Sequence, residues 1–165
     1  MIEPHTLRFA PSGGVPNHPA FPVLIYRAAF PAEAGNIERR VNANGWECRW
    51  RDGIFDYHHF HSTAHEALMV AKGYARVQLG GPDGVVLAIA AGDAVVLPAG
   101  TGHRRLSASE DFLVVGAYPP GQDYAIERPD LQRLTAAFST IARVETPAGD
   151  PVTGYSGALP QLWTR

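Results

Sequence analysis

Short apolar runs, each followed by a turn signal, fill the middle of this chain between Trp46 and Tyr118. The sequences GGPDG at 80–84 and AAGD at 90–93 separate neighbouring runs. Regularly spaced short strands with turns between them are typical of sandwiches and barrels, and the chain shows no strand–helix–strand alternation of a parallel sheet. Because 17 Gly and 14 Pro are too many for a helical bundle, we expect an all-β fold. The expected strands are EALMVAKG, YARVQL, VVLAIA, AVVLP and DFLVVGAY.

Two further segments extend this pattern. A hairpin is predicted where WECRW and IFDYHHFH lie on either side of Arg51-Asp52-Gly53, and FPVLIY at 21–26 is predicted to form a short strand. Residues 74–79 alternate polar and apolar side chains, so one face of that strand is polar. Which face lines the interior depends on the strand register, and the sequence leaves that open.

Helices are expected on both sides of the strand region. PAEAGNIERRVNANG at 31–45 begins with a proline, which suits a first helical turn, and ends at Asn44-Gly45. A second helix is predicted at 129–144, where apolar residues recur at spacings of three and four, at Leu131, Leu134, Phe138 and Ile141. Residues 1–20 are predicted to form an extended arm. The tail after residue 144 is predicted to be a loop that packs through Tyr155 and Trp163.

The length of 165 residues fits a single domain over 1–165, with a barrel core at about 46–118, an arm and helix at 1–45, and a helix and tail at 119–165. The net charge of −2 and the lack of a basic patch argue against a nucleic-acid partner. No apolar run reaches the roughly 18 residues of a membrane span. The single Cys48 excludes an intrachain disulfide and suits a reducing cytoplasm, which is the expected location.

Four of the seven histidines lie close together, and an acid follows them directly: His58, His59, His61, His65 and Glu66. On a strand His59 and His61 point to the same face, and a turn after them brings the Glu66 carboxylate back towards it. His103, which follows the turn PAGTG, is the natural source of a further ligand. Imidazoles with a carboxylate suit divalent iron, manganese, zinc, nickel or copper. The alternative is that these are ordinary surface or core histidines.

The spacing of these residues resembles the two motifs of the cupin family. The first motif, G-x5-H-x-H-x4-E-x6-G, is matched at every fixed position, by Gly53, His59, His61, Glu66 and Gly73. The second motif, G-x5-P-x-G-x2-H-x3-N, is matched by Gly92, Pro98, Gly100 and His103, and departs only at its last position, where Ser107 stands in place of Asn. The wider sequence resembles bacterial single-domain cupins of the YjlB type.

The resemblance implies an antiparallel jelly-roll barrel, flanked here by the N-terminal and C-terminal helices. It also implies one divalent transition metal per chain (Fe, Mn, Ni or Zn), held by His59, His61, Glu66 and His103. Some cupins have one residue fewer before the acid, which would put His65 in the ligand position, but Glu66 keeps the residue type of the motif. Cupins commonly pair through strand edges and swapped arms, so a homodimer is expected.

Three more residues are candidates for catalytic roles. His65 is a hydrogen-bond donor that supports the metal ligands, a pocket base, or a turn residue facing solvent. Tyr57 shares strand parity with His59 and is expected to line the cavity. Arg105 shares parity with His103 and either binds a substrate carboxylate or lies exposed at a strand end.

Two functions are compatible with this site. The first is a metal-dependent enzyme of the dioxygenase, isomerase or decarboxylase type, acting on a small polar or acidic molecule. Three imidazoles and a carboxylate would leave two positions open on an octahedral metal for such a substrate. The second is a non-catalytic module that binds or senses a metal or small ligand.

Overall fold

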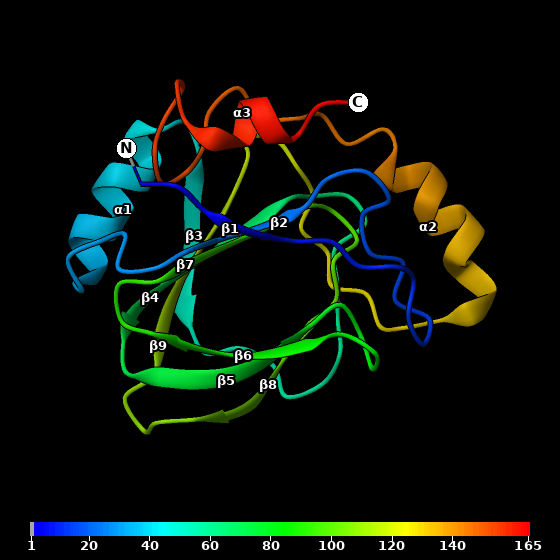
Figure 1. Cartoon of the computed structure of the whole chain (residues 1–165), viewed down its shortest axis with the longest axis horizontal. Coiled ribbons are helices and arrows are strands. Elements are labelled where there is room, and N and C mark those ends of the chain that lie inside the picture. The colour runs from blue at the N-terminus through cyan, green and yellow to red at the C-terminus, as the bar shows by residue number, and fades with distance from the viewer. Residues whose placement is uncertain (1) are drawn as a thin grey trace.

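The computed structural model describes residues 2–165, which form two facing antiparallel sheets with helices at the flanks (Figure 1). The six-stranded sheet has the order β1-β2-β7-β4-β9-β3, and the three-stranded sheet has the order β6-β5-β8. This is the jelly-roll arrangement that the resemblance to cupins implies, and it agrees with the sandwich or barrel expected from the strand pattern. The strands are β1 (His5–Leu7), β2 (Val23–Tyr26), β3 (Glu47–Asp52), β4 (Glu66–Lys72), β5 (Tyr74–Leu79), β6 (Val85–Ala90), β7 (Ala94–Leu97), β8 (His103–Ala108) and β9 (Leu113–Tyr118).

Strand β4 lies at the centre of the six-stranded sheet and is buried on both faces. Leu68 and Val70 pack into the space between the two sheets, whereas Ala67 and Met69 belong to a second core on the outer face of the large sheet. This explains why EALMVAK reads as a continuous apolar run and not as an alternating one. On β5, Ala75, Val77 and Leu79 are buried, so the apolar face of that strand lines the interior.

The predicted hairpin between WECRW and IFDYHHFH is wrong. Strand β3 includes Arg51 and Asp52 and pairs with β9, and the segment after Gly53 runs instead beside β8. There His59 and His103 exchange backbone hydrogen bonds of 3.2 and 3.0 Å, and the Arg105 N–H donates to the Phe55 carbonyl at 2.8 Å. Residues 54–61 therefore connect the two sheets and form no regular strand.

The first helix agrees with its prediction. Helix α1 (Ala34–Ala43) begins after Glu33, whose carboxylate accepts hydrogen bonds from the Gly35 and Asn36 N–H groups, and it ends at Asn44. Its buried side chains, Ile37 among them, pack on the outer face of the large sheet. Among residues 2–165, no helix is both long and apolar enough to cross a membrane.

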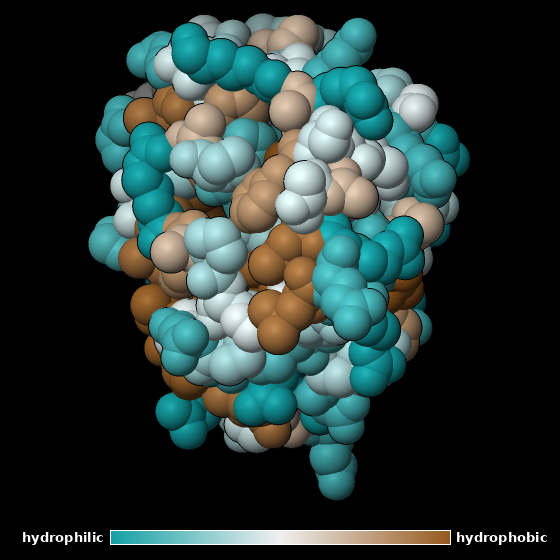
Figure 2. All heavy atoms as spheres, turned by 90° about the vertical axis from the view of Figure 1, so that its right-hand side faces the viewer, coloured by the Kyte–Doolittle hydropathy of each residue, from teal (hydrophilic) through white to brown (hydrophobic). Residues whose placement is uncertain are grey.

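The second helix is shorter than predicted. A 3-10 turn, η1 (Leu131–Arg133), precedes α2 (Leu134–Ile141), and the buried side chains of α2 are Ala137 and Ile141. Leu131, predicted to belong to the buried stripe, is exposed because η1 does not continue the helical phase of α2. Figure 2 views the side on which α2 lies and shows hydrophobic side chains among hydrophilic ones there.

The tail contains a short helix, α3 (Ala158–Leu162), that the sequence did not suggest. Trp163 is buried as predicted, and its indole N–H donates to the Pro22 carbonyl at 2.8 Å. Tyr155, predicted to pack in the same way, is mostly exposed. The arm is fixed through His18, whose ring stacks on Phe21 and whose Nδ1 accepts hydrogen bonds from the Ala20 and Phe21 N–H groups.

We expect His18 to make the fold less stable in acid. Burial, and then the nearby Arg165, lower the pKa of His18 from 6.5 to about 4. Below pH 6.5 the unfolded chain therefore binds a proton at His18 that the folded chain does not bind. As the pH decreases from 6.5 to about 4, the free energy of unfolding decreases by up to about 1.4 kcal/mol per pH unit. In His18→Asn the amide oxygen can replace Nδ1 as acceptor. Urea unfolding at pH 7 and pH 5 should show a smaller pH dependence in this variant than in the wild type, by roughly 2 kcal/mol.

The matched control is His5→Asn, which removes an exposed imidazole from β1. It should keep the pH dependence of the wild type. An equal pH dependence in all three proteins would contradict the assignment to His18.

Candidate metal centre

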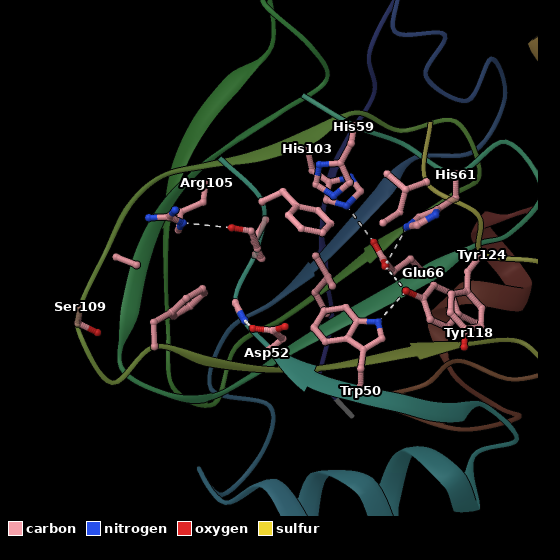
Figure 3. Close-up of a pocket in the computed structure, with 17 residues that line it drawn as sticks. Trp50, Asp52, His59, His61, Glu66, His103, Arg105, Ser109, Tyr118 and Tyr124 are labelled. Atoms are coloured by element: carbon pink, nitrogen blue, oxygen red, sulfur yellow. Dashed lines mark hydrogen bonds and ion pairs between the residues drawn. The ribbon is translucent and has the colours of Figure 1, made fainter. Parts of the chain in front are cut away.

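A cavity of about 510 Å³ opens between the two sheets, and the histidine cluster lies at one end of it (Figure 3). Four residues of the two sequence motifs line it, namely His59, His61, Glu66 and His103. All four are buried, with exposed fractions of 5% or less. The side chains come from the connecting segment, from the first residue of β4 and from the first residue of β8.

The turn before β8 sets the position of His103. The Thr101 N–H donates to the Pro98 carbonyl at 3.2 Å, and the Gly100 N–H donates to the His61 carbonyl at 2.7 Å. Gly100 has a φ of +87°, and a Cβ there would lie 2.4 Å from the Ile141 Cδ1 of helix α2. The positive φ favours glycine, and a side chain here would also have to displace the Ile141 methyl group. The turn thereby ties the segment carrying His61 to the strand carrying His103.

Each of the three histidines has one ring nitrogen facing a backbone carbonyl. The Nδ1 atoms of His59, His61 and His103 lie 3.0 Å from the carbonyl oxygens of Tyr57, Ala125 and Thr101, respectively. A carbonyl only accepts, so each Nδ1 carries the proton and donates. In a neutral imidazole this leaves the Nε2 lone pair free to bind a cation, and metal-bound histidines in proteins are commonly held in this way.

Glu66 lies between two of these rings. Its Oε2 lies 3.1 Å from the Nε2 of His61, and its Oε1 lies 2.9 Å from the Nε2 of His103. One donor atom from each of these three residues falls within 4.8 Å of the other two. His59 lies beside this group, with its ring centre 4.1 Å from that of His103.

The ionised carboxylate of Glu66 favours a positive charge within the cluster. Burial opposes the ionised form of Glu66, but His61 and then His103 outweigh it and hold the pKa of that carboxyl well below its usual range. Burial likewise lowers the pKa of His61, but the Glu66 charge outweighs it and raises that pKa to about 8. Burial, with His103 beside it, lowers the pKa of His59 to about 3. Without a metal, the proton that His61 holds supplies this positive charge. A divalent metal that displaces that proton fits the same donor set of imidazole nitrogens and one carboxylate.

A hydrogen-bonded chain supports the carboxylate from the other side, and the sequence did not single out its members. The Tyr118 hydroxyl donates to Oε2 of Glu66 at 2.7 Å, and the Trp50 indole N–H donates to the Tyr118 oxygen at 2.8 Å (Figure 3). Trp50 lies across β9 at Gly116, where a Cβ would lie 2.1 Å from the indole Cε2. The contact between Tyr118 and Glu66 can be recognised only once β4 and β9 are paired, because Ala67 then faces Ala117 and Tyr118 lies beside Glu66.

Two of the three predicted catalytic residues lie outside the cavity lining, and Arg105 lies within it. His65 directly precedes Glu66 and points to the opposite side, where its Nδ1 accepts from the Ala99 N–H at 2.9 Å and its ring packs near Trp163. It is fully buried, so it is not the solvent-facing turn residue of the alternative prediction either. Tyr57 stacks on Phe55 and lies under the Arg128 guanidinium.

The cupin domain profile matches residues 51–115, a stretch that includes all four predicted ligands. The uncharacterized protein YjlB of Bacillus subtilis is 40% identical over 163 residues, which cover 99% of this chain and 98% of that protein. The chain belongs to the YjlB-type cupins. Solved structures similar to this cupin include an uncharacterized conserved protein with a double-stranded β-helix domain from Klebsiella pneumoniae. Its TM-score is 0.39 at 15% identity, covering 78% of this chain and 81% of that one. A cupin 2 domain-containing protein from Halorhodospira halophila has a TM-score of 0.37 at 18% identity, covering 88% and 83%.

Proposed function

We propose that this cupin is a metal-dependent enzyme that acts on a small molecule bound in the cavity between the sheets. His59, His61, Glu66 and His103 would hold one divalent transition metal per chain, with Fe, Mn, Ni and Zn all suited to the donor set. The observation that carries the proposal is the hydrogen bonding of the three Nδ1 atoms to backbone carbonyls. It leaves the three Nε2 atoms as the ring nitrogens available to a cation, beside one carboxylate that lines the same cavity.

Each part of the chain has a definable task in such an enzyme. A bound metal would supply Lewis-acid or oxygen-activating chemistry, of the kind used by dioxygenases, isomerases and decarboxylases. The Tyr118 hydroxyl holds a proton directed at Glu66, which keeps the carboxylate oriented. The side chains of Ile54 and Leu68 exclude water from the same cavity and so strengthen electrostatic interactions within it.

An enzyme and a non-catalytic binding module differ in whether the bound metal has an open coordination position that water or a substrate can occupy. Protein loaded with manganese should increase the relaxation rate of water protons, because at least one exchangeable water is then bound. A saturating cavity ligand should reduce that increase. Manganese bound without any effect on water relaxation would overturn the enzymatic proposal and favour the non-catalytic module.

Tyr118→Phe should weaken metal binding without unfolding the protein. The variant removes the hydroxyl that donates to Glu66 Oε2 and leaves a ring of the same shape. Loss of such a supporting hydrogen bond typically lowers metal affinity about 10- to 100-fold. Competition with a chelator measures the affinity, and Tyr74→Phe, which removes the hydroxyl of an exposed tyrosine on β5, is the matched control. Equal affinity in Tyr118→Phe and the wild type would show that the hydrogen bond does not support the site.

A further inference from the structure

The cavity contains more than its histidine end. Figure 3 shows Glu66, His61 and Tyr118 together at one end, and Arg105 and Ser109 well away from them at the other. Asp52 apart, the rest of the lining is mostly apolar or aromatic, and includes Trp50, Ile54, Phe55, Leu68, Phe112 and Ile126. A ligand that fills this cavity must therefore offer an apolar body as well as polar groups.

Exposed apolar side chains also line the cavity. Phe55 is 46% exposed, Tyr124 is 40% exposed and Ile126 is 49% exposed, although each of them also contributes to the lining. Large apolar side chains left exposed around a concave site commonly mark ligand binding. These three residues lie in loops, and of the three Tyr124 also stacks on a strand residue, Tyr118 of β9.

Arg105 is the one arginine or lysine among the described residues that line the cavity. It is half-buried, and its Nε donates to the Ile54 carbonyl at 3.1 Å, which fixes the orientation of the guanidinium. Within residues 2–165 the side chain forms no ion pair. A fixed guanidinium with its terminal N–H groups unpaired binds planar anions, carboxylates above all, through two parallel hydrogen bonds.

We propose that the cavity binds an amphipathic carboxylic acid, whose carboxylate pairs with Arg105 and whose aromatic or branched aliphatic body lies along the apolar wall towards Glu66. This substrate class rests on the proposed function, because it assigns a ligand to the same cavity. It narrows the expectation of a small polar or acidic molecule, since a very small polar acid would leave the apolar lining unfilled.

Asp52 is the charge that opposes this assignment. It is exposed, lines the cavity, and accepts a hydrogen bond from the Gly53 N–H at 2.7 Å. A carboxylate bound at Arg105 would be repelled by it, in proportion to their proximity. Removing the Asp52 charge should therefore strengthen binding of an anionic ligand and leave binding of a neutral one unchanged.

Calorimetric titration with matched probes tests the proposal. The probes are 4-phenylbutyrate, its neutral amide 4-phenylbutyramide, acetate, and phenyl phosphate. We expect 4-phenylbutyrate to bind at least about tenfold more tightly than its amide or acetate, because it alone offers both the charge and the apolar body. Arg105→Gln should abolish the preference for acid over amide and leave the affinity for the amide unchanged, and Asp52→Asn should increase the preference.

The control is Arg104→Gln on the neighbouring residue, whose Nε donates to Gln78 and which does not line the cavity. It should behave as the wild type. The proposal would be overturned if acid and amide bound equally, if Arg105→Gln had no effect, or if no probe bound. If phenyl phosphate bound more tightly than 4-phenylbutyrate, the ligand of Arg105 would be a phosphate and not the proposed carboxylate. Titrations repeated after chelator treatment should keep the same ranking, because neither Arg105 nor the apolar wall needs a metal. If the proposed metal-dependent function proved wrong, this binding test would therefore still give a clear result.

Discussion

Glu66→Gln should purify with less than about a tenth of the metal bound by the wild-type protein, for which we expect about one ion per chain. The substitution keeps the shape of the side chain but removes the charge that faces the Nε2 atoms of His61 and His103 at 3.1 and 2.9 Å. It also places an amide where the Tyr118 hydroxyl donates. Elemental mass spectrometry of the purified proteins measures the metal content directly.

His61→Gln and His103→Gln should lose the metal in the same way, because one donor atom from each of these residues lies within 4.8 Å of the others. His58→Gln is the matched control, since this histidine belongs to the same segment but does not line the cavity. Wild-type metal content in Glu66→Gln, with its fold intact by circular dichroism, would remove Glu66 from the ligand set.

His59→Gln separates a four-ligand site from a three-ligand site. The ring of His59 lies beside that of His103, with Nδ1 held by the Tyr57 carbonyl, but His59 is not part of the tight group of three donors. If His59 is the fourth ligand, its loss should lower the metal content as strongly as the loss of His61. A content unchanged from the wild type would reduce the site to His61, Glu66 and His103.

Much of this arrangement could be predicted because the relevant signals are local. Each strand from β4 to β9 is a short run of residues with its own turn signal, so its position depends on few distant contacts. The four predicted ligands occur at fixed spacings around turns, and the turn itself favours glycine at Gly100. The family resemblance rests on those same residues, and the profile match over residues 51–115 covers them.

What could not be predicted depends on strand pairing. Residues 54–61 form no hairpin with β3 because β3 has its partner in β9, which is more than sixty residues further along the chain. Tyr118 supports Glu66 for the same reason, since only the pairing of β4 with β9 brings the two side chains together. His65 turned away from the cavity because neighbours on a strand face opposite sides, a distinction that one residue of register decides. The homodimer and the cytoplasmic location stay predictions.

Asp150→Ala should cost roughly 3–5 kcal/mol of unfolding free energy, a large share of what a domain of this size has. Asp150 is fully buried on the outer face of the large sheet, and its carboxylate accepts hydrogen bonds from four donors. Oδ1 accepts from the N–H groups of Val152 and Thr153, at 2.8 and 3.1 Å, and Oδ2 accepts from the Leu159 N–H at 3.1 Å and from the Tyr26 hydroxyl. An alanine would leave all four donors without this acceptor, and three of the four hydrogen bonds are fully buried.

Urea unfolding followed by tryptophan fluorescence measures this loss, because Trp46 and Trp163 both belong to the core around Asp150. Asp123→Ala is the control, since Asp123 also accepts from a backbone N–H in a turn but is exposed, and we expect it to cost less than about 1 kcal/mol. If Asp150→Ala also lost less than about 1 kcal/mol of unfolding free energy, the tail would not be held by this carboxylate.

At temperatures where Asp150→Ala remains folded, this variant should bind metal as the wild type does, because Asp150 lies on the opposite face of the large sheet from Glu66. Glu66→Gln should do the reverse, losing the metal while keeping the fold, so the two variants together separate the stability of the barrel from the chemistry inside it.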